Sequence, residues 1–373
     1  MEHATLAPPT LFDLLARTWQ RPAAIGSAIF NADQTAVAFA CADGSLAIAP
    51  VADAEPPTRR IRRDLETGRT TIRPRSKPVL PATLVGAFAE GPPIMAPYGQ
   101  SGFLAGGADG RLHQVTARGQ VVRLAASRGP IVAIDRHAAT RRVAVAAGAE
   151  IVIYAEDLGD TLRLAAPALA SGVAFSPDGS EVAAAHLQGL SIWKANGASG
   201  GRRDLPFAGH PAAISWSPDG NWIACSLAAG GFQLVRLADG ANGAVSGYPA
   251  PVRALGWSRA AGALVTSGAF RVTAWSMECP PLGGDMAGAL VTGRAGLVPL
   301  ETVAAHPLRN LVAAGYANGL LNIAQIGGRD ELLIRPDGGA VTALAWSKDG
   351  SHLAFGAADG TAALIGFPPQ IFK

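Results

Sequence analysis

A unit of about 41 residues recurs along this chain, and no other feature of the sequence constrains the fold so strongly. Its clearest copies begin at Gly172, Ala213 and Ala343, and each combines alternating apolar segments with a polar turn, a small-residue segment and a glycine-containing turn. The apolar residue before the first turn is a reference position that recurs at Phe30, Ala96, Ile134, Phe175, Trp216, Trp257, Ala305 and Trp346. Successive reference positions are 66, 38, 41, 41, 41, 48 and 41 residues apart. This periodicity indicates one structural unit per repeat.

The segments within each unit predict short strands joined by tight turns. Their apolar residues alternate with a period of two, and the segments are too short for helices. Ser-Pro-Asp-Gly, at residues 176–179 and 217–220, is typical of turns, because proline restricts φ, aspartate accepts from the backbone ahead and glycine tolerates positive φ. Small residues in the middle segment, such as Ala183–Ala185, let neighbouring sheets approach closely, as the blades of a propeller do.

We therefore expect an all-β propeller made of four-stranded antiparallel blades. Eight repeat units are present, which predicts eight blades. The second unit, residues 93–116, is weak, and if it is not a blade the propeller has seven.

Several short motifs resemble those of the WD repeats. They are the Phe-Ser-Pro-Asp-Gly and Trp-Ser-Pro-Asp-Gly turns, the Ala-Asp-Gly turns that begin at Ala42, Ala108 and Ala358, and the dipeptide Gly209-His210. The resemblance extends over about residues 23–367 and implies a WD-repeat-like β-propeller. It indicates the fold more strongly than the function, because one fold of this kind hosts many functions.

The sequence departs from the WD-repeat pattern in two respects. The Trp-Asp pair that closes the third strand is replaced by Trp193-Lys194 and Trp275-Ser276. No unit contains the complete set of His, Ser or Thr, Asp and Trp, so we expect the buried hydrogen-bond networks of that set to be missing. No binding residue is transferred from the family for this reason.

Two parts of the chain fall outside the repeats. Residues 1–22 form an N-terminal segment, and the resemblance implies that it closes the last blade. Within it, residues 10–20 fit either a strand or a short helix, since their apolar residues also follow helical spacing. Residues 23–373 then form a single propeller domain with an Arg-rich insertion at about residues 52–80.

The insertion concentrates positive charge. Residues 58–78 contain seven arginines and one lysine against two acidic residues, a net charge of +6, whereas the whole chain carries +3. Such a segment is a possible anchor for RNA or an acidic partner, or it is a solvated connection whose residues 70–75 supply the outer strand of the first blade. The candidate anchor residues are Arg59, Arg60, Arg62, Arg63, Arg69, Arg73 and Arg75.

No catalytic, cofactor or metal motif is present in the sequence. The phosphate-binding loop and the hydrolase and metalloprotease signatures are absent. The three cysteines are scattered, which argues against a disulfide framework or a thiolate zinc site. No run of about 18 apolar residues exists, so no membrane span is expected. We predict no enzyme activity, no cofactor and no metal.

The remaining hypothesis is a cytoplasmic scaffold that binds one or more proteins through a propeller face, with the basic insertion as a possible anchor. The high alanine and glycine content and the four lysines are typical of bacteria with GC-rich genomes. Turns between second and third strands gather on one face of a propeller, and two arginines lie where the chain enters a blade. The candidate partner-binding residues at these positions are Asp43, Asp109, Arg111, Arg128, Glu150, Arg253, Arg271 and Asp359.

Overall fold

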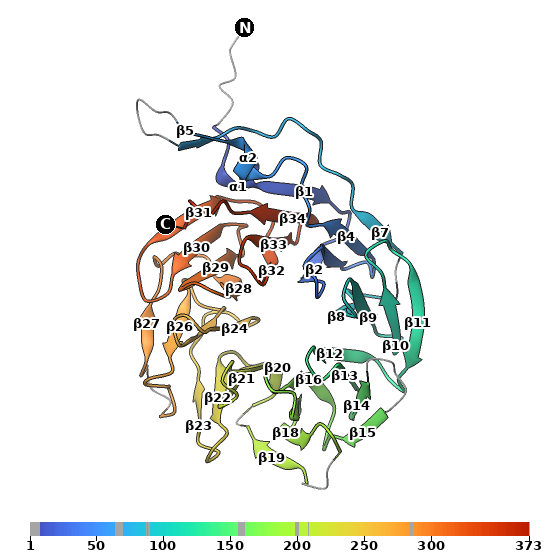
Figure 1. The fold of residues 1–373 in the computed structure, drawn as a ribbon. Coiled ribbons are helices and arrows are strands. Elements are labelled where there is room, and N and C mark those ends of the chain that lie inside the picture. The colour runs from blue at the N-terminus through green and yellow to red at the C-terminus, as the bar shows by residue number, and fades with distance from the viewer. Residues whose placement is uncertain are drawn as a thin grey trace.

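The computed structural model describes residues 8–63, 70–86, 88, 90–155, 161–197, 201–207, 209–283 and 286–372. Eight four-stranded antiparallel sheets are arranged as blades around a central axis (Figure 1). The predicted eight-bladed, WD-repeat-like propeller is therefore confirmed. The seven-blade alternative is wrong, because the weak second unit forms a complete sheet of its own.

The first strand of each blade lies nearest the axis. All eight reference positions of the sequence repeat lie on these inner strands. Five of them are the last residue of the strand, whereas Ile134 is followed by three more residues of β12. From blade one to blade eight the inner strands are β2 (Ile25–Phe30), β8 (Ile94–Tyr98), β12 (Ile131–His137), β16 (Ala170–Phe175), β20 (Pro211–Trp216), β24 (Leu255–Ser258), β28 (Leu300–Ala305) and β32 (Val341–Trp346).

The second and third strands follow outward by antiparallel pairing. The second strands are β3 (Ala36–Cys41), β9 (Gly102–Gly106), β13 (Arg142–Ala147), β17 (Glu181–His186), β21 (Trp222–Leu227), β25 (Ala263–Thr266), β29 (Leu311–Tyr316) and β33 (His352–Ala357). The third strands are β4 (Leu46–Pro50), β10 (Arg111–Val115), β14 (Glu150–Ala155), β18 (Gly189–Lys194), β22 (Phe232–Arg236), β26 (Thr273–Ser276), β30 (Leu321–Gln325) and β34 (Thr361–Gly366).

The outer strand of the last blade comes from the beginning of the chain. From blade one to blade eight the outer strands are β7 (Thr83–Val85), β11 (Val121–Ala126), β15 (Thr161–Ala165), β19 (Arg203–Pro206), β23 (Asn242–Val245), β27 (Ala289–Val291), β31 (Glu331–Arg335) and β1 (Ala16–Gln20). Because β7 is the outer strand of blade one, the expectation that residues 70–75 supply it is wrong. These residues contribute instead to a separate hairpin of β5 (Ile61–Arg63) with β6 (Thr70–Ile72).

The N-terminal segment contains both of the elements that its sequence allowed. Helix α1 (Leu11–Leu15) begins with a capping box between Thr10 and Asp13, and β1 follows it directly. Antiparallel pairing of β1 with β34 joins the beginning of the chain to its last blade. Phe12 and Leu15 are buried against the core of blade eight.

Small residues in the second strands allow adjacent blades to pack closely. A Cβ atom on Gly106 would lie 2.8 Å from the Ile131 side chain, and one on Gly315 would lie 2.5 Å from Val341. Both contacts reach the first residue of the next inner strand. The small-residue segment of the repeat is thus needed where a second strand meets the next blade.

Side-chain hydrogen-bond networks with members other than the complete WD-repeat set are present in two blades. In blade six the Tyr248 hydroxyl accepts from Trp275 Nε1 at 3.3 Å and bonds to Thr266 Oγ1 at 2.8 Å. In blade four the Ser191 hydroxyl bonds to His186 Nε2 at 2.9 Å and donates to Asp204. The networks were missed because they use a tyrosine and a differently placed histidine.

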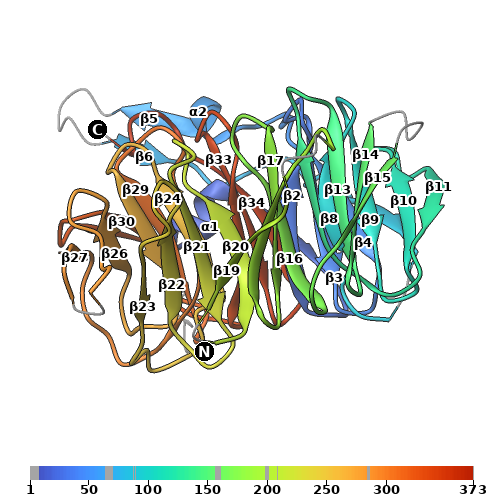
Figure 2. The ribbon, with the colours of Figure 1, turned by 90° about the horizontal axis from the view of Figure 1, so that it is seen from below.

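The propeller has two faces that differ in their turns. We call the end at which the inner strands begin the entry face; it also carries the turns between second and third strands. The opposite end, the exit face, carries the turns between first and second strands. Helix α2 (Pro57–Arg60) and the β5–β6 hairpin lie at the exit face, along the upper edge of Figure 2. No helix in the described part of the chain is long and apolar enough to cross a membrane.

Candidate functional site

The acidic candidates on the entry face are engaged in turn structure. Asp43, Asp109 and Asp359 each accept the backbone N–H two residues ahead, which closes the turn between second and third strands. Hydrogen bonds from Ser45 lower the pKa of Asp43. The pKa of Asp359 is also lowered, because hydrogen bonds from Thr361 outweigh the effect of burial. The acceptor distances are 3.0 Å from Ser45 N, 3.0 Å from Arg111 N and 2.9 Å from Thr361 N.

Ion pairs occupy most of the other charged candidates. Arg111 lies 3.6 Å from the carboxylate of Asp109, and Glu150 accepts from Arg163 at 2.9 Å. Arg253 Nε is 3.3 Å from a Glu301 oxygen. Asp359 lies 3.6 Å from Arg335. Within the described residues, the side chains of the two exposed arginines Arg128 and Arg271 form no ion pair or hydrogen bond.

Blade six carries a basic and apolar patch on the entry face. Three chain segments are joined there: Arg253 N donates to Ser267 Oγ at 3.0 Å, and Gly296 N donates to Phe270 O at 3.0 Å. Arg253 has 66% of its side chain exposed, and Arg271 is also exposed. Phe270 is 42% and Leu297 94% exposed. We call Arg253, Phe270, Arg271 and Leu297 the blade-six patch.

Sequence reasoning identified the two arginines of this patch and missed its two apolar residues. Leu297 lies in the long connection that widens the repeat from 41 to 48 residues, and that irregularity was the available signal. Phe270 is adjacent to Arg271 in the turn. The exposure of Phe270 and Leu297 depends on how the turn packs beside the connection, which the sequence does not indicate.

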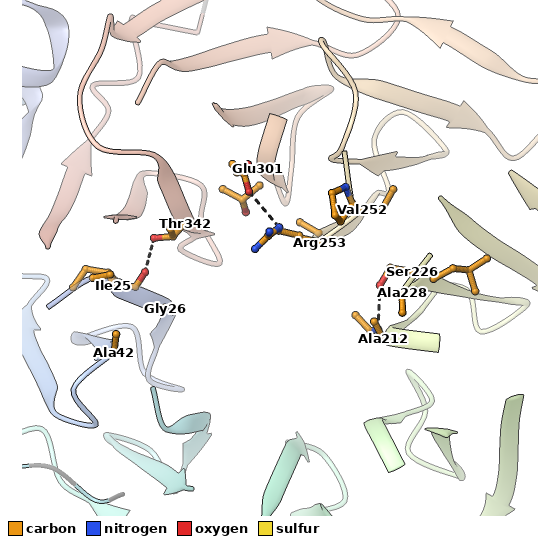
Figure 3. A pocket seen from close by; sticks show the side chains of 16 residues that line it. Ile25, Gly26, Ala42, Ala212, Ser226, Ala228, Val252, Arg253, Glu301 and Thr342 are labelled. Atoms are coloured by element: carbon orange, nitrogen blue, oxygen red, sulfur yellow. Dashed lines mark hydrogen bonds and ion pairs between the residues drawn. The ribbon is translucent and has the colours of Figure 1, made fainter. Parts of the chain in front are cut away.

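A cavity of about 590 Å³ opens at the centre of the entry face (Figure 3). Small residues such as Gly26, Ala42 and Ala212 line much of it, and the Thr342 hydroxyl donates to the Ile25 carbonyl across the last seam between blades. Among the described residues that line it, only Arg253 and Glu301 are titratable, and they pair with each other. The lining residues that the structure describes include no pair of carboxylates and no nucleophile paired with a base, the arrangements that acid–base and covalent catalysis require.

The remaining charged clusters do not suggest a metal centre. Among the residues that the structure describes, no group of three or more His, Cys, Asp and Glu side chains is placed to hold a metal ion.

Two arginines of the insertion are structural, which corrects their assignment to an exposed anchor. Arg60 is 2% exposed and donates to the carbonyls of Leu14 and Arg73 at 2.6 Å and of Glu55 at 3.3 Å. It thereby ties α2 and β6 to the end of α1. A surface charge that contacts phosphate must reach solvent, so Arg60 is not available for that role.

Arg75 belongs to a largely buried ion-pair cluster. It binds the Asp53 carboxylate through two bonds, at 2.9 and 2.5 Å. Arg17 of β1 lies 3.8 Å from the same carboxylate and donates to the carbonyls of Val51 and Ala52 at 2.7 and 2.9 Å. Burial opposes ionisation of Asp53, but the bonds from Arg75 and Glu55 N and the charge of Arg17 lower its pKa.

Three other arginines of the insertion, Arg59, Arg62 and Arg73, are exposed at the exit face. The side chain of Arg63 and all of Arg69 lie outside the described residues. The blade-six patch lies on the entry face and the exposed insertion arginines lie on the exit face. The structure therefore provides two separate candidate surfaces instead of one face with a nearby anchor.

The comparisons with known proteins agree with the architecture. The family model of the WD domain, G-beta repeat, matches residues 204–231 and 333–365, which fall in blades four and five and in blades seven and eight. No curated protein matches the sequence.

Two solved structures share the fold over nearly the whole chain. The computationally designed Ika8 protein aligns with a TM-score of 0.67 and 17% identity, covering 93% of this chain and 98% of that protein. The C-terminal WD40 domain of Sif2 aligns with a TM-score of 0.67 and 12% identity, covering 96% and 99%. The chain therefore contains matches to the WD domain, G-beta repeat, within an eight-bladed β-propeller whose fold is similar to that of these two structures.

Proposed function

We propose that this protein is a non-catalytic scaffold that binds a protein partner through the blade-six patch of its entry face. WD-repeat propellers typically act as protein-interaction scaffolds and are generally non-catalytic. The observation that carries the proposal is the grouping of exposed Phe270 and Leu297 with exposed Arg253 and Arg271 on one joined surface.

The patch has the composition of a protein-binding surface. Aromatic residues and arginines are enriched in interfaces, where they bury much area and pair with acceptors. A leucine that is 94% exposed gains little from the fold, so its side chain is free to enter a pocket of a partner. With the unpaired Arg271 beside these apolar residues, the patch favours a partner segment that carries an acidic residue beside an apolar one.

The other charged candidates of the entry face are less available to a partner than the blade-six patch. The aspartates of its turns are engaged by backbone N–H groups, and Arg111, Glu150 and Asp359 are in ion pairs. Binding through them would require breaking existing contacts, whereas Arg271 has none to lose within the described residues.

The test compares two double variants that remove the same residue types from opposite faces. R271E with L297S alters the blade-six patch, and R62E with L308S alters exposed residues of the exit face. Tagged wild-type and variant proteins are used for affinity capture from native extract with nuclease present, and captured proteins are quantified by mass spectrometry. We expect R271E/L297S to lose a partner that R62E/L308S retains.

Equal retention by both variants, or loss only with R62E/L308S, would remove the blade-six patch from the proposal. Circular dichroism and thermal unfolding of both variants show whether they remain folded, so that loss of the partner can be assigned to the surface.

A second candidate function is binding of RNA or of an acidic partner at the exit face. Its supporting observation is the exposure of Arg59, Arg62 and Arg73. Deletion of residues 58–78 would also remove Arg60 and Arg75, whose bonds hold α1 and β1, so the appropriate variant is R59Q/R62Q/R73Q. RNA binding predicts an affinity that falls about three- to fourfold for each doubling of salt if about two phosphates are neutralised. A flat salt response excludes this candidate.

The proposal places the protein in the cytoplasm. Cys41 and Cys225 are buried and free, Cys279 is exposed and free, and burial raises the pKa of Cys225. Unpaired thiols are usual in a reducing compartment. Cell fractionation with a cytoplasmic and a periplasmic marker tests this placement.

A further inference from the structure

Three tryptophans occupy the same place in three blades but differ in one hydrogen bond. Trp216 Nε1 donates to Ala174 O at 3.1 Å, and Trp346 Nε1 donates to Ala304 O at 3.0 Å. Each acceptor lies on the inner strand of the preceding blade. Trp257 Nε1 is buried and has no acceptor among the described residues. Its indole ring therefore lacks the bond that orients the other two.

A cavity of about 420 Å³ lies beside Trp257 in the exit-face seam between blades five and six. Trp222, Trp257, Met277 and Pro218 give it apolar walls, and Asp219 and Arg259 are its charged lining residues. The cavity is separate from the central one and from the blade-six patch, which belong to the entry face.

The two charged residues of the cavity are not equivalent. Asp219 Oδ1 accepts from Ser217 Oγ at 2.5 Å and from Asn221 N at 3.1 Å, and its Oδ2 accepts from Asn221 Nδ2 at 2.8 Å. Arg259 is exposed, and in the part of the chain that the structure describes its guanidinium has no ion pair or hydrogen bond. The carboxylate is thus engaged by its own turn, whereas the guanidinium is free to bind an anion.

We propose that this cavity binds a small apolar carboxylate. The apolar body packs against Trp222, Trp257 and Met277, and the carboxylate accepts from the Arg259 guanidinium and from Trp257 Nε1. Because Nε1 is shielded from solvent in the structure, the second bond forms when the indole turns about its side-chain bonds. No bond of its own opposes that turn, in contrast to Trp216 and Trp346.

The chemistry of the walls argues for this ligand class over others. A cationic ligand would be repelled by the Arg259 guanidinium, and the Asp219 carboxylate that could attract it is already hydrogen-bonded within its own turn. A phosphate would bury its charge against apolar walls with one arginine beside it, although phosphate sites usually supply several donors. A carboxylate with an apolar body satisfies the free guanidinium, the unpaired N–H and the aromatic walls together.

The test measures binding of 3-phenylpropanoate by isothermal titration calorimetry, with 3-phenylpropanamide as the uncharged comparison. R259Q removes the charge, and W257F removes the N–H while keeping a ring. W346F is the matched control, since it removes an indole N–H that already has an acceptor in another blade. We expect R259Q and W257F each to weaken binding by about ten- to hundredfold, and W346F to leave it unchanged.

The proposal is overturned if 3-phenylpropanoate does not bind, if the amide binds equally well, or if W257F and W346F behave alike. Peptides that end in phenylalanine, with a free or an amidated C-terminus, distinguish the two sources of such a ligand. Tight binding of the free-acid peptide assigns the site to a protein C-terminus, and binding of phenylpropanoate alone assigns it to a small molecule. These results are independent of the blade-six patch, because the two sites lie on different faces.

Discussion

The insertion has many arginines in its sequence but keeps some of them buried or paired, whereas blade six has few arginines and exposes them. Residues 58–78 hold seven arginines, yet Arg60 is buried and Arg75 is bound to Asp53. Blade six has Arg253 and Arg271 on its entry face, and both are exposed. A high local density of arginine therefore does not indicate a high density of available charge.

The difference comes from the acceptors within reach. The insertion passes over the junction of β1 with β34, where backbone carbonyls and the Asp53 carboxylate are available, and guanidinium groups satisfy several of them at once. The turn that carries Arg271 has its polar groups engaged in backbone bonds. Arg60 and Arg75 thus help to hold the ring closed, whereas Arg271 of the entry face remains available for a partner.

The largest effect is expected at the carboxylate that pairs with the exit-face arginines. D53A should lower the free energy of unfolding by about 3 kcal/mol, because it leaves the largely buried charges of Arg17 and Arg75 without their carboxylate. Urea unfolding followed by circular dichroism measures this change. A loss below about 0.5 kcal/mol would mean that the cluster does not stabilise the closure.

The same carboxylate predicts a pH dependence. Because the pKa of Asp53 is lower in the folded protein than its ordinary value, its contribution to stability is fully present above the ordinary range of about 4 and is lost as the pH falls through the folded value. The loss of stability as the pH falls through this window should therefore be smaller in D53A than in the wild type. Identical pH profiles would contradict the assignment.

Replacing Arg60 should have the next largest effect. R60A leaves the carbonyls of Leu14 and Arg73 without their donor and should cost about 2 kcal/mol. The matched control is R59A, since Arg59 is its exposed neighbour and a surface substitution is expected to stay within about 0.5 kcal/mol. Equal thermal shifts for the two variants would show that Arg60 is not structural.

A smaller difference in unfolding free energy is expected between variants of the equivalent tryptophans Trp216 and Trp257. W216F removes the donor to Ala174 O and should cost about 1 kcal/mol beyond the cost of changing the ring. W257F removes an N–H without an acceptor and should lack that additional cost. Parallel chemical unfolding of the two variants measures the difference, and a larger loss in W257F would contradict it.

The repeat made the fold predictable from sequence, because each blade repeats the same alternation and turn chemistry. Phe30 and Trp346 could be placed on inner strands from their spacing alone, and the Asp-Gly turns lie where the spacing put them. In these strands and turns the local sequence pattern agrees with the packing of the blade, so the sequence indicates both the element and its place.

Features that depend on contacts between distant segments could not be predicted in this way. Nothing adjacent to Arg60 in the sequence indicates that its partner is the carbonyl of Leu14, 46 residues away. Tyr248 joins a network with Thr266 and Trp275, although its unit lacks the complete WD-repeat set that would have indicated one. The exposure of Leu297 follows from the path of a connection that has no repeat to guide it.

The most direct test of the comparison measures stability and partner capture on the same two proteins, R60A and R271E/L297S. The account predicts a crossed result: R60A loses about 2 kcal/mol of unfolding free energy and keeps the partner while folded, whereas R271E/L297S keeps its stability within about 0.5 kcal/mol and loses the partner. If R60A loses the partner without losing stability, or if R271E/L297S keeps it, the roles assigned to the two sets of arginines are wrong.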